Sequence, residues 1–404
     1  MSDLSGQLII HLRRVDKALS VSIQSSRPFA AVHVFTGKPV LDVVRQLPAL
    51  FSICATAQAQ ACASACEQAL GLAASRGARQ RRALLLRAET VKEHLWRLLL
   101  DWPKAFAWTP AHEPMASAMR AFFDLRAAQQ ADQEPFTPGA DLASMQPQAQ
   151  RMQVQRLLDS VAQSVFGRLP GLWLQQIRDH DSLSAWAMSA DTIAAALVRA
   201  LLRTDLAGLG RSEVRVLPDW GTQALSVDLA QALGSAHADA FVAAPSWRGN
   251  AHETTPFARC TQCPLVADLA VKYGNGLLPR LAALLVELAE VSLALSGERQ
   301  CSSHQCLSQP AAESIPETSG GIGIGHAHAA RGLLLHRVEL THGQVADYRV
   351  LAPTEWNFHP DGVVASGLAG SGFIGIADDA ELLRRAALYV TAVDPCVAYQ
   401  LSVS

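Results

Sequence analysis

Hydrophobic and polar residues change their spacing twice along the chain. Over residues 6–45, short apolar segments such as QLIIHL, LSVSI and AAVHVF are separated by Ser, Pro and Gly, which predicts a few strands. From residue 47 the sequence is rich in Ala, Gln and Leu, and apolar residues recur every third or fourth position, which predicts helices. Beyond residue 320, GLLLHRVEL and VADYRVLAP alternate and predict a β-hairpin that turns at His342-Gly343.

The last predicted helix, DAELLRRAALYVTAV, leads directly into Asp394-Pro395-Cys396. Residues 130–150 and 297–320 show neither spacing and are rich in Pro, Gly and polar residues, which predicts two long loops. The pattern as a whole predicts an α+β fold that is rich in helix and has small β elements near both ends. A chain of 404 residues has room for one large core or for two to three domains.

Composition and charge exclude several classes of partner. The chain is 50% hydrophobic and 17% charged, with a net charge of −2 and a pI near 6.7, so no basic field attracts nucleic acid. Its longest apolar segment, GLLPRLAALLVELAEVSLAL, contains Arg280, Glu287 and Glu290 and is predicted to be a buried or amphipathic helix, without membrane insertion. The first twenty residues contain no sustained apolar stretch, so a cytoplasmic protein is expected.

Eight cysteines in such a chain are expected to be metal ligands, redox groups or small core residues, not disulfides. Cys396 follows Asp-Pro and lacks a second cysteine three residues later. Cys54 precedes a long predicted helix, whose dipole favours the thiolate, and Ala57 stands where a paired cysteine would be. For either thiol alone, burial as a small hydrophobic residue is the alternative. Cys62 and Cys66 share one helix face and are expected to pack.

These two segments resemble the metal-binding motifs of nickel–iron hydrogenase large subunits. The chain is more similar still to the HupK-type hydrogenase expression/formation proteins, which are degenerate relatives of that subunit. The catalytic large subunits carry Arg-x-Cys-Gly-x-Cys near one end and Asp-Pro-Cys-x-x-Cys near the other, and these supply four thiolates to the metals. Here SICATA retains Cys54, and DPCVAY retains Cys396 but has Tyr399 in the second position.

Other segments match the family in the same order along the chain. SSRPF retains Arg27 of an Arg-Gly-Phe-Glu motif, and HAHAARG retains Arg331 of a Glu-Ala-Pro-Arg-Gly region, with His328 in the glutamate position. LAPTEWNF, which contains Thr354, matches a Pro-x-x-Trp-Asn motif. The resemblance implies a single domain with the large-subunit fold over residues 1–404.

The resemblance implies roles for four residues. Cys54 and Cys396 would hold an iron fragment weakly, because both cysteine positions that bridge nickel and iron in the enzymes are missing here. In the family, Arg331 lies beside the cyanide ligands of the iron, and a guanidinium suits donation to anionic diatomic ligands. Thr354 would add a further hydrogen bond. Without the resemblance, a structural salt bridge is the alternative for Arg331.

We therefore expect a non-enzymatic accessory or scaffold protein of nickel–iron hydrogenase maturation that transiently binds or transfers the Fe(CN)2CO unit. The partners that the resemblance implies are maturation chaperones and the hydrogenase large-subunit precursor. An alternative is an interaction protein that mimics the large subunit and recruits maturation or protective factors without binding metal. A degenerate hydrogenase with residual activity is a third interpretation, which the missing ligands disfavour.

A second candidate metal site is formed by Cys260, Cys263, Cys301 and Cys306. The first two form a Cys-x-x-Cys pair in RCTQCP, and the others flank His304 in QCSSHQC. The two halves, about forty residues apart, have the ligand types for a structural zinc ion. Unligated thiols in a loop, or an oxygen-sensitive redox pair, are the alternatives.

The glycine-rich run SGGIGIGHAHAARG is not a phosphate-binding loop by its spacing, because it lacks both Gly-x-Gly-x-x-Gly and a following Gly-Lys-Ser/Thr. His326, His328 and His336 have even spacing and are expected on one side of a strand, where they would serve nickel transiently. Solvated loop histidines are the favoured interpretation of these three residues, and the strand with transient nickel binding is the alternative.

Overall fold

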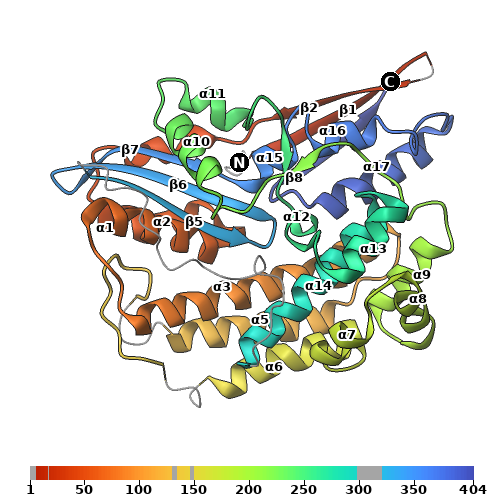
Figure 1. Cartoon of the computed structure of the whole chain (residues 1–404), viewed down its shortest axis with the longest axis horizontal. Helices are drawn as coiled ribbons and strands as arrows, with labels where there is room; N and C mark the ends of the chain where they lie inside the picture. The colour runs from red at the N-terminus through yellow and green to blue at the C-terminus, as the bar shows by residue number, and fades with distance from the viewer. Residues whose placement is uncertain (1–5, 17, 130–133, 146–149, 298–320) are drawn as a thin grey trace.

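The computed structural model describes residues 6–16, 18–129, 134–145, 150–297 and 321–404 (Figure 1). Its strands are β1 (Gln7–Val15), β2 (Ala18–Ser25), β3 (Arg215–Val216), β4 (His252–Glu253), β5 (Ile322–Ala329), β6 (Gly332–Thr341), β7 (Gln344–Leu351) and β8 (Ala398–Val403). Short 3-10 helices are η1 (Phe29–Phe35) and η2 (Ser52–Cys54), and π-helical turns are η3 (Arg97–Asp101) and η4 (Ala162–Phe166).

The α-helices in the first half of the chain are α1 (Val40–Leu50), α2 (Ala55–Leu70), α3 (Arg76–Trp96), α4 (Trp102–Ala105), α5 (His112–Gln129), α6 (Arg151–Val161), α7 (Pro170–Gln176), α8 (His180–Ser189) and α9 (Ile193–Leu202). Those in the second half are α10 (Gln223–Leu233), α11 (Ala238–Ala243), α12 (Pro256–Cys260), α13 (Pro264–Tyr273), α14 (Leu277–Ser296), α15 (Pro353–Asn357), α16 (Val363–Leu368) and α17 (Asp379–Val393).

Helix α14 is the central element of the helical part of the molecule. It runs through the helical part of the molecule (Figure 1) and contacts α3, α6, α7, α12 and α13. Every residue from 277 to 292 is buried. The predicted buried helix is therefore confirmed. Within the described ranges, no single helix has both the length and the apolar composition needed to cross a bilayer. In the same described ranges, one bent pair, α1 with residues 52–70, meets both criteria when its two helices are taken together, and these helices meet at 105°.

The predicted hairpin is confirmed as β6 and β7, which form an antiparallel sheet with β5. His342 and Gly343 between them both have positive φ values, of 53° and 76°, as a two-residue hairpin turn requires. Helix α2 covers one face of this sheet and α10 packs on the other (Figure 1). The glycine-rich run forms β5, where a Cβ at Gly323 or Gly325 would collide with the backbone of α2, so glycine permits this close packing.

One predicted strand is wrong. The segment AAVHVF forms the 3-10 helix η1, which begins after Pro28. Its two buried side chains, Val32 and Phe35, are three residues apart, which matches the three-residue period of a 3-10 helix and not the alternation of a strand. Of the two predicted loops, residues 134–145 contain no helix or strand, and residues 298–320 lie outside the described part of the chain.

A second sheet joins the two ends of the described chain. Its strand order is β2-β1-β8, with β1 antiparallel to β2 and parallel to β8. The register pairs Gln7 with Ala398, so β8 starts two residues after Cys396. This pairing anchors the Asp-Pro-Cys segment to the N-terminal strand.

The helical core contains a buried carboxylate whose charge makes stability depend on pH. Glu287 of α14 accepts hydrogen bonds from Arg259 Nε and Nη2, at 2.6 and 2.8 Å, and lies 2.8 Å from His94 Nε2. Burial alone would raise the pKa of Glu287, but Arg259 and His94 lower it from 4.5 to about 2. The folded-state pKa lies below the unfolded value, so this stabilisation is present above about pH 4.5 and is lost as the pH falls towards 2.

We expect this group to lower the free energy of unfolding by about 2 kcal/mol between about pH 6 and about pH 3. Urea denaturation of the wild type and of Glu287→Gln at both pH values measures the effect. Because glutamine does not titrate, Glu287→Gln should lose about 2 kcal/mol less unfolding free energy than the wild type over this pH range. An equal loss in both proteins would contradict the assignment.

Candidate functional site

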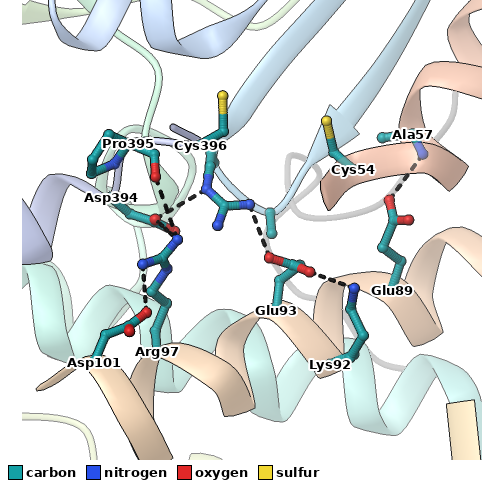
Figure 2. A network of polar contacts seen from close by, with 12 residues as sticks. Cys54, Ala57, Glu89, Lys92, Glu93, Arg97, Asp101, Asp394, Pro395 and Cys396 are labelled. Atoms are coloured by element: carbon teal, nitrogen blue, oxygen red, sulfur yellow. Dashed lines mark hydrogen bonds and ion pairs between the residues drawn. The ribbon is translucent and has the colours of Figure 1, made fainter. Parts of the chain in front are cut away.

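The structure brings the two predicted metal ligands, Cys54 and Cys396, to one cavity of about 240 Å³. Cys54 lies where η2 meets α2, and Cys396 lies in the short loop between α17 and β8. Both side chains are partly exposed, and Figure 2 shows both thiols pointing in the same direction from their separate elements. Thiols from the two ends of the sequence therefore face one space.

The loop that carries Cys396 is held from three sides. Asp394 ends α17 in the left-handed region, with φ of 68°, and its carboxylate pairs with Arg97 and Arg331. Arg97 Nη2 also donates to the Pro395 carbonyl at 3.4 Å (Figure 2). On the other side of Cys396, β8 is fixed by its pairing with β1. These contacts set the position of the thiol.

Cys54 is positioned by the first turn of α2. The backbone N–H groups of Thr56 and Ala57 donate to the buried Glu89 carboxylate at 2.7 and 2.9 Å, so Glu89 satisfies two of the otherwise unpaired donors of this helix end. Gln58 Nε2 donates to Cys54 Sγ at 3.7 Å. Burial, and then the neighbouring Cys396 and Glu89, raise the pKa of the Cys54 thiol to about 12, although Arg331 and Gln58 act in the opposite direction.

This raised pKa predicts the reactivity of Cys54. Only the thiolate is alkylated, so the rate constant of its reaction with iodoacetamide should increase about tenfold per pH unit between about pH 8 and pH 11. Peptide mass spectrometry measures the rate at Cys54 separately from the other cysteines. Gln58→Leu removes the donor to the sulfur and should slow the reaction further. A plateau below about pH 10 would contradict the raised pKa.

Arg331 is buried and charged beside the thiols. Its Nε donates to Asp394 and its Nη1 to Glu93, both at 3.0 Å, and neither carboxylate engages Nη2. Burial would lower the pKa of Arg331, but Asp394 and Glu93, followed by Cys396 and Cys54, raise it. Arg331 lines the cavity, so it provides a fixed positive charge there.

Thr354, the other predicted binding residue, contacts the metal-ligand candidate directly. It is buried in the first turn of α15, and its Oγ1 lies 2.9 Å from Cys396 Sγ. The two groups share a hydrogen bond in which either atom can be the donor. Thr354 can therefore orient the Cys396 thiol or donate to its thiolate.

The sequence did not identify the helix that supports both thiols. Glu89, Glu93 and Arg97 lie four residues apart along α3 and into η3, on one side of the helix. They hold the start of α2, the Arg331 guanidinium and the Asp394–Pro395 loop respectively (Figure 2). Helix α3 carries many other charged residues, so the four-residue spacing of these three did not distinguish them in the sequence.

Ala57 and Tyr399 stand where the resemblance predicts the second cysteine of each motif. Ala57 is fully buried in α2 and packs in the core below the hairpin sheet. Tyr399 lies in β8, where its backbone pairs with Leu8. Two thiols therefore remain at the cavity.

The second candidate metal site is only half described. Cys260 ends α12 and Cys263 precedes α13, and both are buried, with Cys260 Sγ 3.6 Å from the Ala283 carbonyl. Cys301 and Cys306 lie outside the described residues. Among the residues that are described, no three His, Cys, Asp or Glu side chains are arranged to hold a metal ion. The zinc site stays a prediction.

Both interpretations of the three histidines are wrong, because these residues lie in strands β5 and β6, not in a loop, and they do not share one side of a strand. His326 and His328 lie on one face of β5, beside Trp220 and Asp219. His336 pairs with Gly325 across the sheet and therefore points to the opposite face. There its ring lies 2.8 Å from both Gln58 Oε1 and the Tyr348 hydroxyl.

The predicted packing of Cys62 and Cys66 agrees with the structure. Both lie fully buried in α2, with their sulfur atoms 4.0 Å apart, in the core between α2 and the hairpin sheet. Neither lines the cavity that contains Cys54 and Cys396. These two thiols belong to the core.

Comparison with known proteins gives a consistent result. Residues 283–400 match the family model described as nickel-dependent hydrogenase. The chain is 32% identical to the hydrogenase expression/formation protein HoxV of Cupriavidus necator, over 93% of this chain and 91% of that protein. It is 28% identical to the hydrogenase expression/formation protein HupK of Azotobacter vinelandii, over 99% of both.

Solved structures show which fold the chain shares. An NAD+-reducing NiFe hydrogenase in the H2-reduced state matches with a TM-score of 0.61 at 15% identity, over 94% of this chain and 93% of that one. The Ni-Fe-Se hydrogenase from D. vulgaris Hildenborough matches with a TM-score of 0.57 at 14% identity, over 95% and 94%. The predicted large-subunit fold, rich in helix with small β elements near both ends, is confirmed.

Proposed function

Since the chain belongs to the family of hydrogenase expression/formation proteins that includes HoxV and HupK, its role in hydrogenase formation is an accessory one, and we propose that it holds the Fe(CN)2CO unit transiently. The observation that carries the proposal is the shared cavity of Cys54 and Cys396. Thiolates are soft ligands that suit iron, and both thiols are accessible from the same space.

The neighbours of the thiols support a cyanide-bearing cargo. Arg331 is charged, fixed by two carboxylates, and has Nη2 available for donation to an anionic diatomic ligand. Thr354 holds the Cys396 sulfur and keeps it oriented. In this proposal the arginine binds the cargo through its cyanide groups, while the thiolates bind the metal.

Weak retention suits an accessory role. Two thiolates hold a metal less firmly than the four of a hydrogenase, and a cargo that must be passed on has to leave. Because Ala57 and Tyr399 provide no thiolates, we further propose that the protein does not turn over hydrogen. The chaperones that deliver the unit and the large-subunit precursor that receives it are the proposed partners, in the cytoplasm.

Iron content tests this proposal. Protein isolated anaerobically from cells that express the maturation machinery should contain iron, and Cys54→Ser or Cys396→Ser should reduce that iron at least about fivefold. Cys66→Ala is the matched control, because Cys66 is buried on α2 away from the cavity. Equal, background iron in all four proteins, with maturation intact, would favour an interaction protein that works through its surface.

A further inference from the structure

Arg27 is a second buried guanidinium at the cavity. It lies between β2 and η1, lines the same cavity as the two thiols, and its side chain is only 9% exposed. Its Nη1 lies 2.8 Å from Oε1 of Glu355, the acidic residue in the first turn of α15. Among the described residues, however, Arg27 Nη1 has no partner in hydrogen-bonding geometry, and neither has Glu355 Oε2. The pair is therefore held by charge and not by a complete set of hydrogen bonds.

Arg27 acts on the same two sulfur atoms as Arg331. Burial would lower the pKa of Arg27, but Cys396, Glu355 and Cys54 raise it. Both guanidinium groups thus lie within the electrostatic range of both thiols, and they repel one another. They differ in their support, because two carboxylates fix Arg331 while one carboxylate pairs with Arg27.

The charge of the proposed cargo requires more than Arg331. A ferrous ion with two cyanides is neutral, and two thiolate ligands give the bound complex two negative charges. Burying such charge is costly unless cations compensate it. Arg331, Arg97 and Lys92 form a network with Glu93, Asp394 and Asp101, in which the charges balance. Arg27 is the other cation among the described residues that line the cavity, and its single carboxylate partner leaves it incompletely hydrogen-bonded.

We propose that Arg27 is a second anion-binding group of the cavity. Its incompletely hydrogen-bonded guanidinium donates hydrogen bonds to the anionic ligands of a thiolate-bound complex. The identity of that ligand as the Fe(CN)2CO unit rests on the proposed function. The proposed preference of the cavity for small anions depends on Arg27 and Arg331 and not on the identity of the cargo. Glu355 holds Arg27 until the anion arrives and then accepts fewer contacts from it.

A pair of alkylating reagents tests the anion preference without any iron. Iodoacetate is an anion and iodoacetamide is neutral, and in both cases the Cys396 thiolate sulfur attacks the CH2 carbon of the reagent, forms the S–C bond and displaces iodide. The ratio of their rate constants at Cys396, measured by peptide mass spectrometry, cancels any change in thiolate population. Arg27→Gln should lower the iodoacetate-to-iodoacetamide ratio by about threefold to tenfold, and added salt should reduce the difference.

Two variants control this experiment. Arg45→Gln makes the same charge change at an exposed position of α1 outside the cavity and should leave the ratio unchanged. Arg27→Lys keeps the charge and should keep most of the ratio, which also covers the case in which Arg27→Gln does not fold. The proposal is overturned if Arg27→Gln and Arg45→Gln give the same ratio of rate constants. It is also overturned if Arg27→Lys, which keeps the charge, lowers the ratio by the same threefold to tenfold that is expected for Arg27→Gln.

The result is distinguishable from the test of the proposed function. Iron in the wild type, with an unchanged alkylation ratio in Arg27→Gln, would overturn the role of Arg27 and leave the cargo proposal standing. If Arg27→Gln lowers the ratio but the wild-type protein never contains iron, the anion-binding role of Arg27 stands and the proposal that the cavity holds the Fe(CN)2CO unit is overturned. Where iron is bound, Arg27→Gln should also shift the cyanide stretching frequencies, whereas Arg45→Gln should not.

Discussion

Replacing either Cys54 or Cys396 by serine is expected to lower hydrogenase maturation by about tenfold or more in cells that depend on this protein. Each thiol is one of two that face the shared cavity, and serine offers a hard, protonated hydroxyl in place of a soft thiolate. The change in volume is small, so folding should be preserved. Hydrogen uptake by the hydrogenase in complemented deletion cells measures the effect.

The control for this prediction is Cys66→Ala. This change removes a thiol from the same helix as Cys54, but one that packs in the core. It should leave maturation within about twofold of wild type, after correction for the amount of folded protein. Full maturation by the double variant Cys54→Ser/Cys396→Ser would show that the thiols are dispensable.

Arg280→Leu is expected to lower the free energy of unfolding by about 3–5 kcal/mol, because it leaves a buried carboxylate without its charge partner. Arg280 of α14 is 1% exposed, Glu253 of β4 is fully buried, and Arg280 Nη2 donates to Glu253 Oε2 at 2.9 Å. The guanidinium also lies over the rings of Phe257 and Tyr389, each 5.6 Å away. Urea denaturation measures the loss.

A second substitution separates the charge effect from lost packing. In Arg280→Leu/Glu253→Gln the unpaired carboxylate is removed, so the double variant should recover part of the lost stability. A loss below about 1 kcal/mol in Arg280→Leu would contradict the description of this pair as a buried support of the fold. The pair also matters for the site, since the next residue after Glu253, Thr254, donates through its backbone N–H to Asn357, which in turn donates to the Arg331 carbonyl.

Local patterns in the sequence predicted much of the fold. The hairpin of β6 and β7 has alternating residues and a two-residue turn, and α14 has a long, predominantly apolar sequence, so short-range rules are sufficient. Strand β8 was not predicted, because its pairing partner, β1, lies at the other end of the chain. The 3-10 helix η1 was missed because the short apolar composition of AAVHVF is typical of a strand, and the three-residue spacing of its buried side chains, Val32 and Phe35, is known only from the structure.

The site was only partly predictable for a similar reason. The resemblance pointed to Cys54, Cys396, Arg331 and Thr354, and these four residues do lie near one another. Their supporting residues were hidden, because a charged residue on a helix is usually exposed and nothing local marks Glu89 as buried or Arg97 as partly buried. Arg27 and Glu355 meet only in the folded chain, so their ion pair has no local signature.

The most direct test of the central claim is infrared spectroscopy of protein isolated anaerobically from cells that express the hydrogenase maturation machinery. The account predicts cyanide and CO stretching bands in the wild type that are absent from both Cys54→Ser and Cys396→Ser. Bands that persist unchanged in the double variant, or a wild type without such bands while maturation proceeds, would contradict it.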